Sequence, residues 1–300
     1  MPGCPDRSCA KTHRMYRACL LWLALRAVSA AESLTLTLLP VPFPLHDRPA
    51  CPSLSEDGRL LAYQSRQLAG AGGADIWLSR YENGRWSAPY NAGPGINTAE
   101  EEVDAKLSPD GRSIIFIRGR NLRESSGVWI SRFQGGAWSR AELVGPPVSV
   151  AGTAQFGAVL TRDGKRMYFA SNRPGGLGGF DHYYTDRTGS GWSEPVNLTA
   201  INTAGNDADI APSRDGRTLV FPARREPSFG ETDLYRTRWE NGALTAPENL
   251  GPRINTPGHD TCPWLGYDGH TLYLNSTWNG LTGGVKGESR IWMIRYSGGF

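Results

Sequence analysis

The dipeptide Asp-Gly recurs along this chain at a nearly fixed interval. It occurs five times as a regular series, and the steps between successive copies are 53, 53, 52 and 53 residues. The five aspartates are Asp57, Asp110, Asp163, Asp215 and Asp268. Turn residues between short apolar runs, repeated at this period, are typical of a blade of antiparallel strands rather than of a helical solenoid unit. The sequence therefore predicts an all-β repeat protein.

Each repeat is expected to contain four strands, with the Asp-Gly turn between the first and the second. The second strands are predicted at 60–65, 113–117, 166–171, 218–222 and 271–276. The third strands each carry an aromatic residue at a common place, namely Trp77, Trp129, Tyr183, Tyr235 and Trp292. Because these rings recur in every repeat, we interpret them as packing residues between adjacent sheets. The 37 glycines and 21 prolines fit a chain with many turns.

The two ends of the repeat array are complementary. The fifth repeat ends after its third strand, whereas residues 34–39 align with a fourth strand and precede the first repeat. We expect this segment to complete the last sheet, which would join the ends into a ring without an unpaired edge. The prediction is a five-bladed β-propeller. Its blades are expected near 51–98, 103–150, 156–203, 208–256 and 261–300, the last with 34–39.

The first thirty residues have the pattern of an export signal. Lys11, Arg14 and Arg17 precede an apolar stretch that ends in Val28-Ser29-Ala30. Residues 1–30 contain five basic residues and one acidic residue, so the formal charge falls from +3 to −1 when they are removed. A near-neutral mature chain argues against a nucleic-acid partner. We expect a periplasmic or secreted protein of residues 31–300, monomeric and without a transmembrane segment in its mature part.

Two cysteines lie outside the predicted leader. Cys51 and Cys262 each stand six positions before their Asp-Gly, so they are equivalent residues of the first and last repeats. A closed ring would bring them side by side, and we expect a disulfide between them, as is common in oxidising compartments. The alternative is a pair of buried, unpaired thiols, since the Cα atoms of neighbouring strands can exceed the ~7 Å limit of a disulfide.

Several recurring polar residues have structural explanations. The Asp-Gly aspartates are expected to accept hydrogen bonds inside their turns. Asp75, Asp181 and Asp233 begin third strands and are expected to bind the backbone amides of the preceding glycine-rich loops. The asparagines of the Ile-Asn-Thr motif are interpreted as loop-fixing residues; they are Asn97, Asn202 and Asn255.

The candidate site lies around the axial channel, on the face away from the Asp-Gly turns. Acidic residues precede the inner strands, and arginines follow the second strands at eight to ten residues past each Asp. The candidate binding residues are Glu102, Asp104, Asp207, Asp209, Asp260, Arg66, Arg118, Arg173, Arg224 and Trp264. One interpretation is that acids and arginines neutralise one another in local ion pairs. The other is a ligand site for a peptide or a sugar on a concave axial face.

A family resemblance is carried by the third repeat. The run from Phe169 to Asp181, Phe-Ala-Ser-Asn-Arg-Pro-Gly-Gly-Leu-Gly-Gly-Phe-Asp, is followed by Trp-Ser-Glu-Pro-Val-Asn-Leu at 192–198. Together with Ile-Asn-Thr at 201–203, it resembles the WD-like propeller repeat of exported bacterial proteins, including the TolB-like propellers. The resemblance implies a non-catalytic, protein-binding scaffold of the cell envelope whose partner is an envelope protein or peptide. Repeat two departs from the pattern at Val128 and at Val148-Ser149-Val150.

Two alternatives remain open at this stage. Several five-bladed propellers are glycoside hydrolases, and Asp104, Asp209 and Asp260 are placed to serve as channel carboxylates of such an enzyme or of a glycan-binding protein. The same oxygen atoms could hold a calcium ion in the channel. We expect no other cofactor, since the sequence contains no cluster of cysteines and histidines that would predict zinc.

Overall fold

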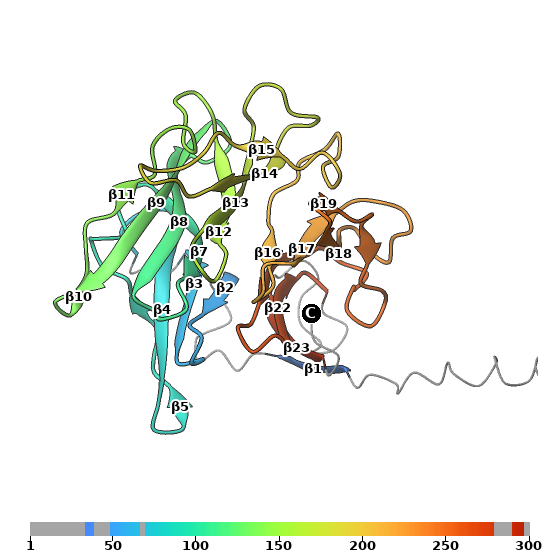
Figure 1. Ribbon diagram of the computed structural model, residues 1–300. Coiled ribbons are helices and arrows are strands. Elements are labelled where there is room, and N and C mark those ends of the chain that lie inside the picture. Colours follow the sequence, from blue (N-terminus) through green and yellow to red (C-terminus); the bar gives the residue numbers. More distant parts are fainter. Residues whose placement is uncertain (1–33, 39–48, 67–69, 279–289, 297–300) are drawn as a thin grey trace, which may run out of the picture. The chain divides into compact units, whose positions relative to one another are not determined.

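The computed structural model describes residues 34–38, 49–66, 70–278 and 290–296 (Figure 1). The predicted export signal at residues 1–30 lies outside this part of the chain. Within the described residues, no helix is long and apolar enough to cross a membrane.

The described strands form five antiparallel sheets, each of which is one blade. Blade 1 contains β2 (Ala50–Leu54), β3 (Leu60–Ser65), β4 (Asp75–Glu82), β5 (Arg85–Trp86) and β6 (Tyr90–Asn91). Blade 2 contains β7 (Glu101–Leu107), β8 (Ser113–Asn121), β9 (Ser125–Gln134), β10 (Ala137–Trp138) and β11 (Glu142–Leu143). Blade 3 contains β12 (Gln155–Leu160), β13 (Arg166–Ser171), β14 (Asp181–Asp186) and β15 (Val196–Asn197). Blade 4 contains β16 (Ala211–Pro212), β17 (Thr218–Ala223), β18 (Asp233–Glu240), β19 (Ala243–Leu244) and β20 (Glu248–Asn249). Blade 5 contains β21 (Asp260–Leu265), β22 (Thr271–Ser276) and β23 (Arg290–Tyr296), with β1 (Leu34–Leu38) beside β23. The protein is a five-bladed β-propeller, as the sequence predicts.

β1 pairs with the third strand of the fifth blade. β1 runs antiparallel to β23, with a register from Leu34 opposite Tyr296 to Leu38 opposite Trp292. This is the strand order β1-β23-β22-β21 that the sequence analysis expects for the fifth blade.

The outer strands differ from the prediction of one continuous fourth strand. In blades 1, 2 and 4 the fourth strand is divided into two short pieces, both paired with the third strand. Pro89 separates β5 from β6, and Pro247 separates β19 from β20. Proline cannot donate a backbone hydrogen bond, so it interrupts the ladder at an edge where no further strand pairs.

The Asp-Gly turns have the structural role expected of them. In each turn the aspartate carboxylate accepts a backbone N–H two residues later, and Asp163 also accepts the Thr161 hydroxyl at 2.7 Å. The five glycines have φ between 65° and 74°, the left-handed region that glycine adopts without a steric penalty. The hairpin signal in the sequence is confirmed.

Side chains at the third strands hold the long connections in place. Asp75 accepts the N–H of Ala71, and Asp233 accepts that of Phe229 at 2.7 Å. Asn202 accepts the N–H of His182 and donates to its carbonyl, and the equivalent asparagines of two other blades do the same. Both predictions of loop-fixing residues are confirmed.

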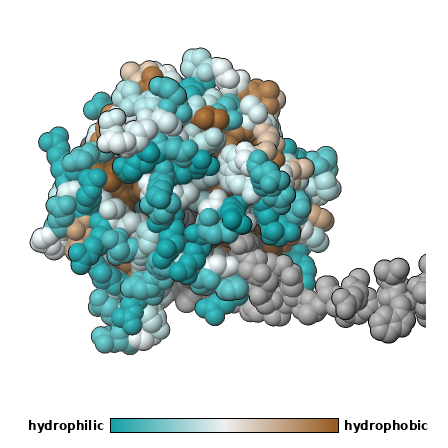
Figure 2. Space-filling model, viewed as in Figure 1, coloured by the Kyte–Doolittle hydropathy of each residue, from teal (hydrophilic) through white to brown (hydrophobic). Residues whose placement is uncertain are grey.

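Apolar side chains fill the space between neighbouring blades. The largest cluster of the described residues contains Tyr63, Tyr168, Phe221 and Trp264, which come from four different blades. All five recurring third-strand aromatics lie in such clusters or pack against them. On the face shown in Figure 2, hydrophilic residues predominate and hydrophobic ones are scattered.

The turn aspartates make the stability of the fold dependent on pH. Hydrogen bonds from Thr161 and Lys165 lower the pKa of Asp163 below its ordinary value of 3.8, and the other four turn aspartates have lowered pKa values as well. A lowered pKa in the folded state contributes stability above the unfolded value, and that contribution is lost as the pH falls through the folded value. We therefore expect the contribution of the turn aspartates to the free energy of unfolding to decrease as the pH falls from about 5 to about 3.

Urea denaturation at both pH values, with Asp163→Asn as the matched variant, measures the contribution of one turn. The asparagine oxygen can still accept both hydrogen bonds but does not titrate. The variant should lose less stability over this interval than the wild type, and an equal loss would show that Asp163 does not contribute.

Candidate functional site

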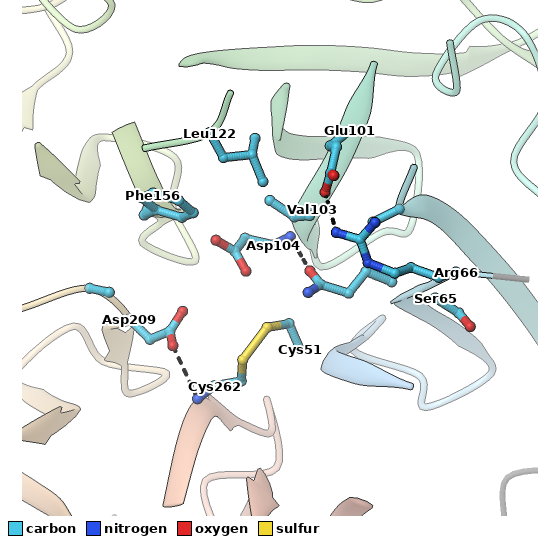
Figure 3. A pocket seen from close by; sticks show the side chains of 13 residues that line it. Cys51, Ser65, Arg66, Glu101, Val103, Asp104, Leu122, Phe156, Asp209 and Cys262 are labelled. Atoms are coloured by element: carbon cyan, nitrogen blue, oxygen red, sulfur yellow. Dashed lines mark hydrogen bonds and ion pairs between the residues drawn. A yellow bond between two sulfur atoms is a disulfide. The ribbon is translucent and has the colours of Figure 1, made fainter. Parts of the chain in front are cut away.

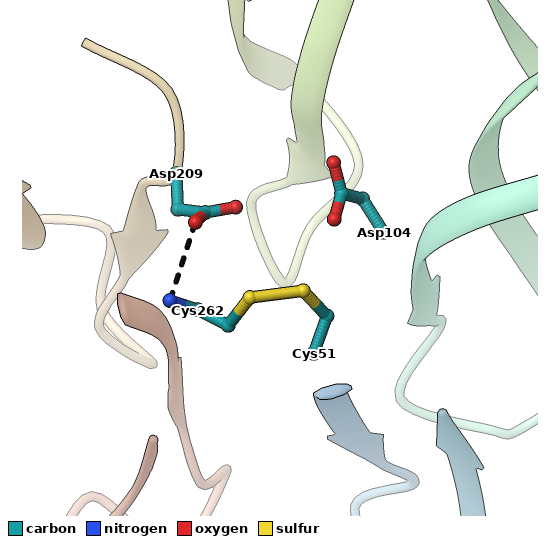
Figure 4. A group of neighbouring side chains, drawn as sticks. All are labelled: Cys51, Asp104, Asp209 and Cys262. Atoms are coloured by element: carbon teal, nitrogen blue, oxygen red, sulfur yellow. Dashed lines mark hydrogen bonds between the residues drawn. A yellow bond between two sulfur atoms is a disulfide. The ribbon is translucent and has the colours of Figure 1, made fainter. Parts of the chain in front are cut away.

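The inner strands of four blades contain a one-residue bulge at the same position. The register of β2, β7, β12 and β21 shifts there against the second strand. The residues at the bulge have φ between 49° and 55°; they are Cys51, Asp104, Gly157 and Cys262. A bulge adds a residue to one strand and redirects its side chain. Figures 3 and 4 show the three side chains of this group pointing toward one another.

Blade 4 supplies an equivalent residue without a long inner strand. Asp209 precedes the short strand β16 and stands six residues before Asp215, the same spacing that the four bulge residues keep to their own Asp-Gly. We call the five equivalent residues, Cys51, Asp104, Gly157, Asp209 and Cys262, the axial ring. In Figure 4, the Asp209 carboxylate lies beside Cys262 and faces the same space as Asp104.

A circle of hydrogen bonds joins each blade to the next at the axial ring. Each bond involves a ring residue, either through its backbone or through its carboxylate. The donors and acceptors are Asp104 N and Gln64 Oε1 (2.7 Å), Gly157 N and Asp104 Oδ2 (3.2 Å), His182 Nε2 and the Asp209 carbonyl (3.1 Å), Cys262 N and Asp209 Oδ2 (3.2 Å), and Cys51 N and Asn275 Oδ1 (2.8 Å). The ring residues thus hold the five blades together as well as lining the channel.

The two cysteines of the ring form a disulfide. Cys51 and Cys262 have Cα atoms 4.8 Å apart, within the range that a disulfide can span. The bond joins the first blade to the last across a sequence separation of 211 residues.

The two aspartates of the ring share their surroundings with a buried lysine. Burial and the neighbouring charge of Asp209 raise the pKa of Asp104 to about 7. Lys106 is only 3% exposed, and burial lowers its pKa although both aspartates favour its charged form. Its Nζ has no hydrogen-bond partner among the described residues and lies 5.8 Å from the centre of the Trp264 ring. Attraction to the two carboxylates offsets part of the cost of burying the lysine charge.

A pocket of about 530 Å³ opens onto the axial ring (Figure 3). All five blades contribute to its lining. Asp104, Asp209 and the disulfide lie at its centre, and Val103, Leu122 and Phe156 supply apolar wall. At one side, Arg66 Nη2 pairs with Glu101 Oε2 at 2.6 Å; the arginine side chain is 63% exposed. Five of the predicted residues therefore meet in one pocket: Arg66, Asp104, Asp209, Cys51 and Cys262.

Three other predicted acids lie outside this pocket. Glu102, Asp207 and Asp260 are buried, and each accepts the backbone N–H and the hydroxyl of a threonine four residues earlier. Burial raises the pKa of Asp260 to about 6 and also raises that of Glu102, despite the nearby Arg118. These contacts fix the segment that enters each inner strand, so the structure gives the three acids a local role.

The predicted arginines other than Arg66 bind backbone carbonyls or side chains outside the axial pocket. Arg118 pairs with Glu102 at 2.8 Å and donates to the Ile96 carbonyl, and Arg173 donates to the carbonyls of Pro147 and Val148. Arg224 is exposed and its Nε donates to the Thr232 hydroxyl at 3.3 Å. The ion pair between Arg118 and Glu102 agrees with the first interpretation of the sequence, in which acids and arginines neutralise one another.

Some site residues were missed by the sequence analysis. Trp264, predicted as a binding residue on the face away from the Asp-Gly turns, is instead buried. It packs edge-on against Tyr267, beside an Asp-Gly turn. Lys106 is not among the predicted site residues, although it lies between Ala105 and Leu107 and two residues after Asp104. The six-residue spacing was applied to the cysteines alone; extended to all repeats, it identifies Asp104, Gly157 and Asp209.

The donor set at the ring does not suit calcium. Among the described residues, the one group able to offer several metal ligands consists of Cys51, Asp104, Asp209 and Cys262. Calcium takes six to eight oxygen ligands. Two of the four donor atoms are sulfur, so a channel calcium ion, one of the alternatives left open by the sequence, does not fit this group.

Comparison with known proteins supports the fold. No protein-family model and no curated protein matches the chain. Among solved structures, TolB from Agrobacterium tumefaciens is 16% identical, with a TM-score of 0.53 over 89% of this chain and 99% of that one. An alpha-L-arabinofuranosidase from Lactobacillus brevis is 13% identical, with a TM-score of 0.55 over 85% and 94%. TolB from Acinetobacter baumannii is 18% identical with a TM-score of 0.49 over 84% of this chain, which spans 55% of that protein. The chain is thus a propeller that resembles TolB and glycoside hydrolases.

The electrostatic attraction between Lys106 and the ring aspartates is testable by stability. At pH 8, Lys106→Met should lower the free energy of unfolding by roughly 1–3 kcal/mol, because it leaves the buried Asp104 carboxylate and the half-buried Asp209 carboxylate close to each other without a nearby cation. Adding Asp104→Asn should recover part of this loss, since it removes the repulsion. Urea denaturation measures both values. The exposed Lys165→Met serves as control, with an expected change within about 0.5 kcal/mol. A Lys106→Met, Asp104→Asn double variant less stable than Lys106→Met alone would contradict this electrostatic interaction.

Proposed function

We propose that this protein is an exported, non-catalytic propeller that binds a peptide segment of a cell-envelope protein in the axial pocket. The observation that carries the proposal is the pocket itself, which all five blades line and which has apolar walls and two carboxylates. Its volume of about 530 Å³ is in the range of pockets that enclose a ligand group. The predicted leader and the disulfide support export.

The chemistry of the pocket favours a basic side chain or a free amino end on the ligand. Glu101 and Arg66 neutralise each other at one side. Asp104 and Asp209 face a single lysine, so the aspartates carry the greater formal charge. An apolar wall beside a carboxylate pair suits the long aliphatic stem and charged end of lysine or arginine. The resemblance to TolB-like propellers, which implies protein binding, supports the same function.

Peptide binding by purified, oxidised protein in the presence of a metal chelator tests this function. An array of short synthetic peptides should yield a bound subset rich in lysine and arginine. Asp209→Asn should raise the Kd of a bound peptide about 10-fold, which corresponds to a loss of about 1.4 kcal/mol of binding free energy. Glu240→Gln removes the same charge at an exposed position of β18 and should leave the Kd unchanged.

Binding of no peptide, or equal affinity of the wild type and Asp209→Asn, would contradict this function. Circular dichroism of the variants establishes that each has kept the wild-type fold before its affinity is compared.

Glycoside hydrolysis is a second candidate, favoured by the closeness of Asp104 and Asp209. Oxygen atoms of the two carboxylates lie within 4.8 Å of each other. Retaining glycosidases hold their two carboxyl groups about 5–5.5 Å apart. Asp260, the third carboxylate that the sequence suggests for a glycoside hydrolase, accepts a hydrogen bond from the Thr256 N–H and lies outside the pocket.

A panel of aryl glycosides, including arabinofuranosides, tests this candidate. If the pair is catalytic, the wild type should release the aryl group, and Asp104→Asn and Asp209→Asn should each lower the rate by at least about 100-fold. Glu101→Gln, at the side of the same pocket, is the control. Absence of hydrolysis by the wild type, or equal rates in all variants, removes the candidate.

A further inference from the structure

Four side chains with metal-binding atoms converge at the axial ring. Cys51 and Cys262 offer sulfur, and Asp104 and Asp209 offer carboxylate oxygen; one such atom from each lies within 4.8 Å of all the others. The four residues come from blades 1, 2, 4 and 5 (Figure 4). No two of them are close in sequence, so the propeller alone assembles the group.

The fifth position of the ring explains why there are four donors. Gly157 of blade 3 offers no side chain, and a Cβ built there would lie 2.7 Å from the Ala208 carbonyl oxygen. The backbones of blades 3 and 4 approach too closely at this point for any larger residue. Five equivalent positions therefore present two sulfurs and two carboxylates around one space.

The carboxylates are already oriented by their neighbours. Asp104 Oδ2 accepts the N–H of Gly157, and Asp209 Oδ2 accepts that of Cys262, both at 3.2 Å. Each aspartate thereby has one oxygen engaged and the other, Oδ1, available as a ligand. Such supporting hydrogen bonds fix ligand orientation in protein metal sites.

We propose that reduction of the Cys51–Cys262 disulfide creates a site for one zinc-like divalent ion, held by two thiolates and two carboxylates. In the oxidised protein the sulfur atoms are bonded to each other, and the complete donor set does not exist. The disulfide therefore gates the site. The proposal goes beyond the proposed peptide binding and does not depend on it.

The reaction has two balanced steps. A dithiol reductant transfers two electrons and two protons to the disulfide, giving two thiols and the disulfide of the reductant. The divalent ion then binds both sulfurs and both carboxylates, and the two thiol protons leave to solvent.

The arrangement fits zinc in geometry and charge. Zinc–sulfur distances of about 2.3 Å and zinc–oxygen distances of about 2.0–2.2 Å place tetrahedral ligands roughly 3.3–3.8 Å apart. The present spread of up to 4.8 Å requires a small contraction, and the sulfurs must separate after reduction. Two thiolates and two carboxylates outweigh the ion, and Lys106 offsets part of the excess. The axial pocket provides the path of entry, since all four donors line it.

Cobalt(II) titration of the purified protein, with and without prior reduction by a dithiol, tests the proposal. Reduced wild type should bind one Co²⁺ per chain and show a thiolate-to-cobalt charge-transfer band with the visible bands of tetrahedral cobalt. Oxidised wild type should show neither. Asp209→Asn should weaken metal binding by the reduced protein at least about 100-fold, whereas Glu240→Gln, at an exposed position of β18, should not change it.

A second measurement needs no variant. Zn²⁺ should slow alkylation of Cys51 and Cys262 in the reduced wild type, and a chelator should restore the rate. Equal cobalt binding before and after reduction, binding that is unaffected by Asp209→Asn, or alkylation that is indifferent to Zn²⁺ would overturn the proposal. Peptide binding is measured on oxidised, chelator-treated protein, so failure of one proposal leaves the other unaffected.

Discussion

The circle of hydrogen bonds at the axial ring is the interaction on which the rest of this structure depends. Each inner-strand bulge interrupts the regular pairing of its strand, and the backbone N–H of the bulge residue donates to a side chain of an adjacent blade. A non-glycine residue in the left-handed region costs about 1–3 kcal/mol, and such strain persists where the surrounding structure compensates it. Here the compensation comes from contacts between blades, so the ring both costs and supplies stability.

The disulfide adds a covalent bond between the first and last blades to this circle of hydrogen bonds. In the chain-entropy model, joining residues separated by 211 positions stabilises the fold by about 5 kcal/mol. At the other end of the channel, the Tyr267 hydroxyl of blade 5 donates to the Leu107 carbonyl of blade 2, and Glu56 of blade 1 pairs with Arg162 and Arg214 of blades 3 and 4. Contacts of all five blades thus occur at both ends of the axis.

The sequence predicts features that depend on local geometry and fails for those that depend on the ring. The Asp-Gly period predicts the blade count, and the loop-fixing roles of Asp75 and Asn202 follow from side-chain hydrogen bonding to nearby backbone. The positions of the acids before the inner strands and of the arginines after the second strands predict that both groups lie near the channel. However, the sequence gives no measure of burial, so Glu102 and Arg118 could not be distinguished from Asp104. Lys106 interacts electrostatically with Asp104 of blade 2 and Asp209 of blade 4. Because these two aspartates are far apart in the sequence, no local spacing predicts this interaction.

In the structure, the first and last blades meet at the axial ring through the Cys51–Cys262 disulfide. Mass-spectrometric mapping of peptides from unreduced protein, with thiols blocked before digestion, detects this link. We expect one linked peptide pair that contains Cys51 and Cys262 and that disappears after reduction. Recovery of both cysteines only as blocked, unlinked thiols from the folded protein would contradict it.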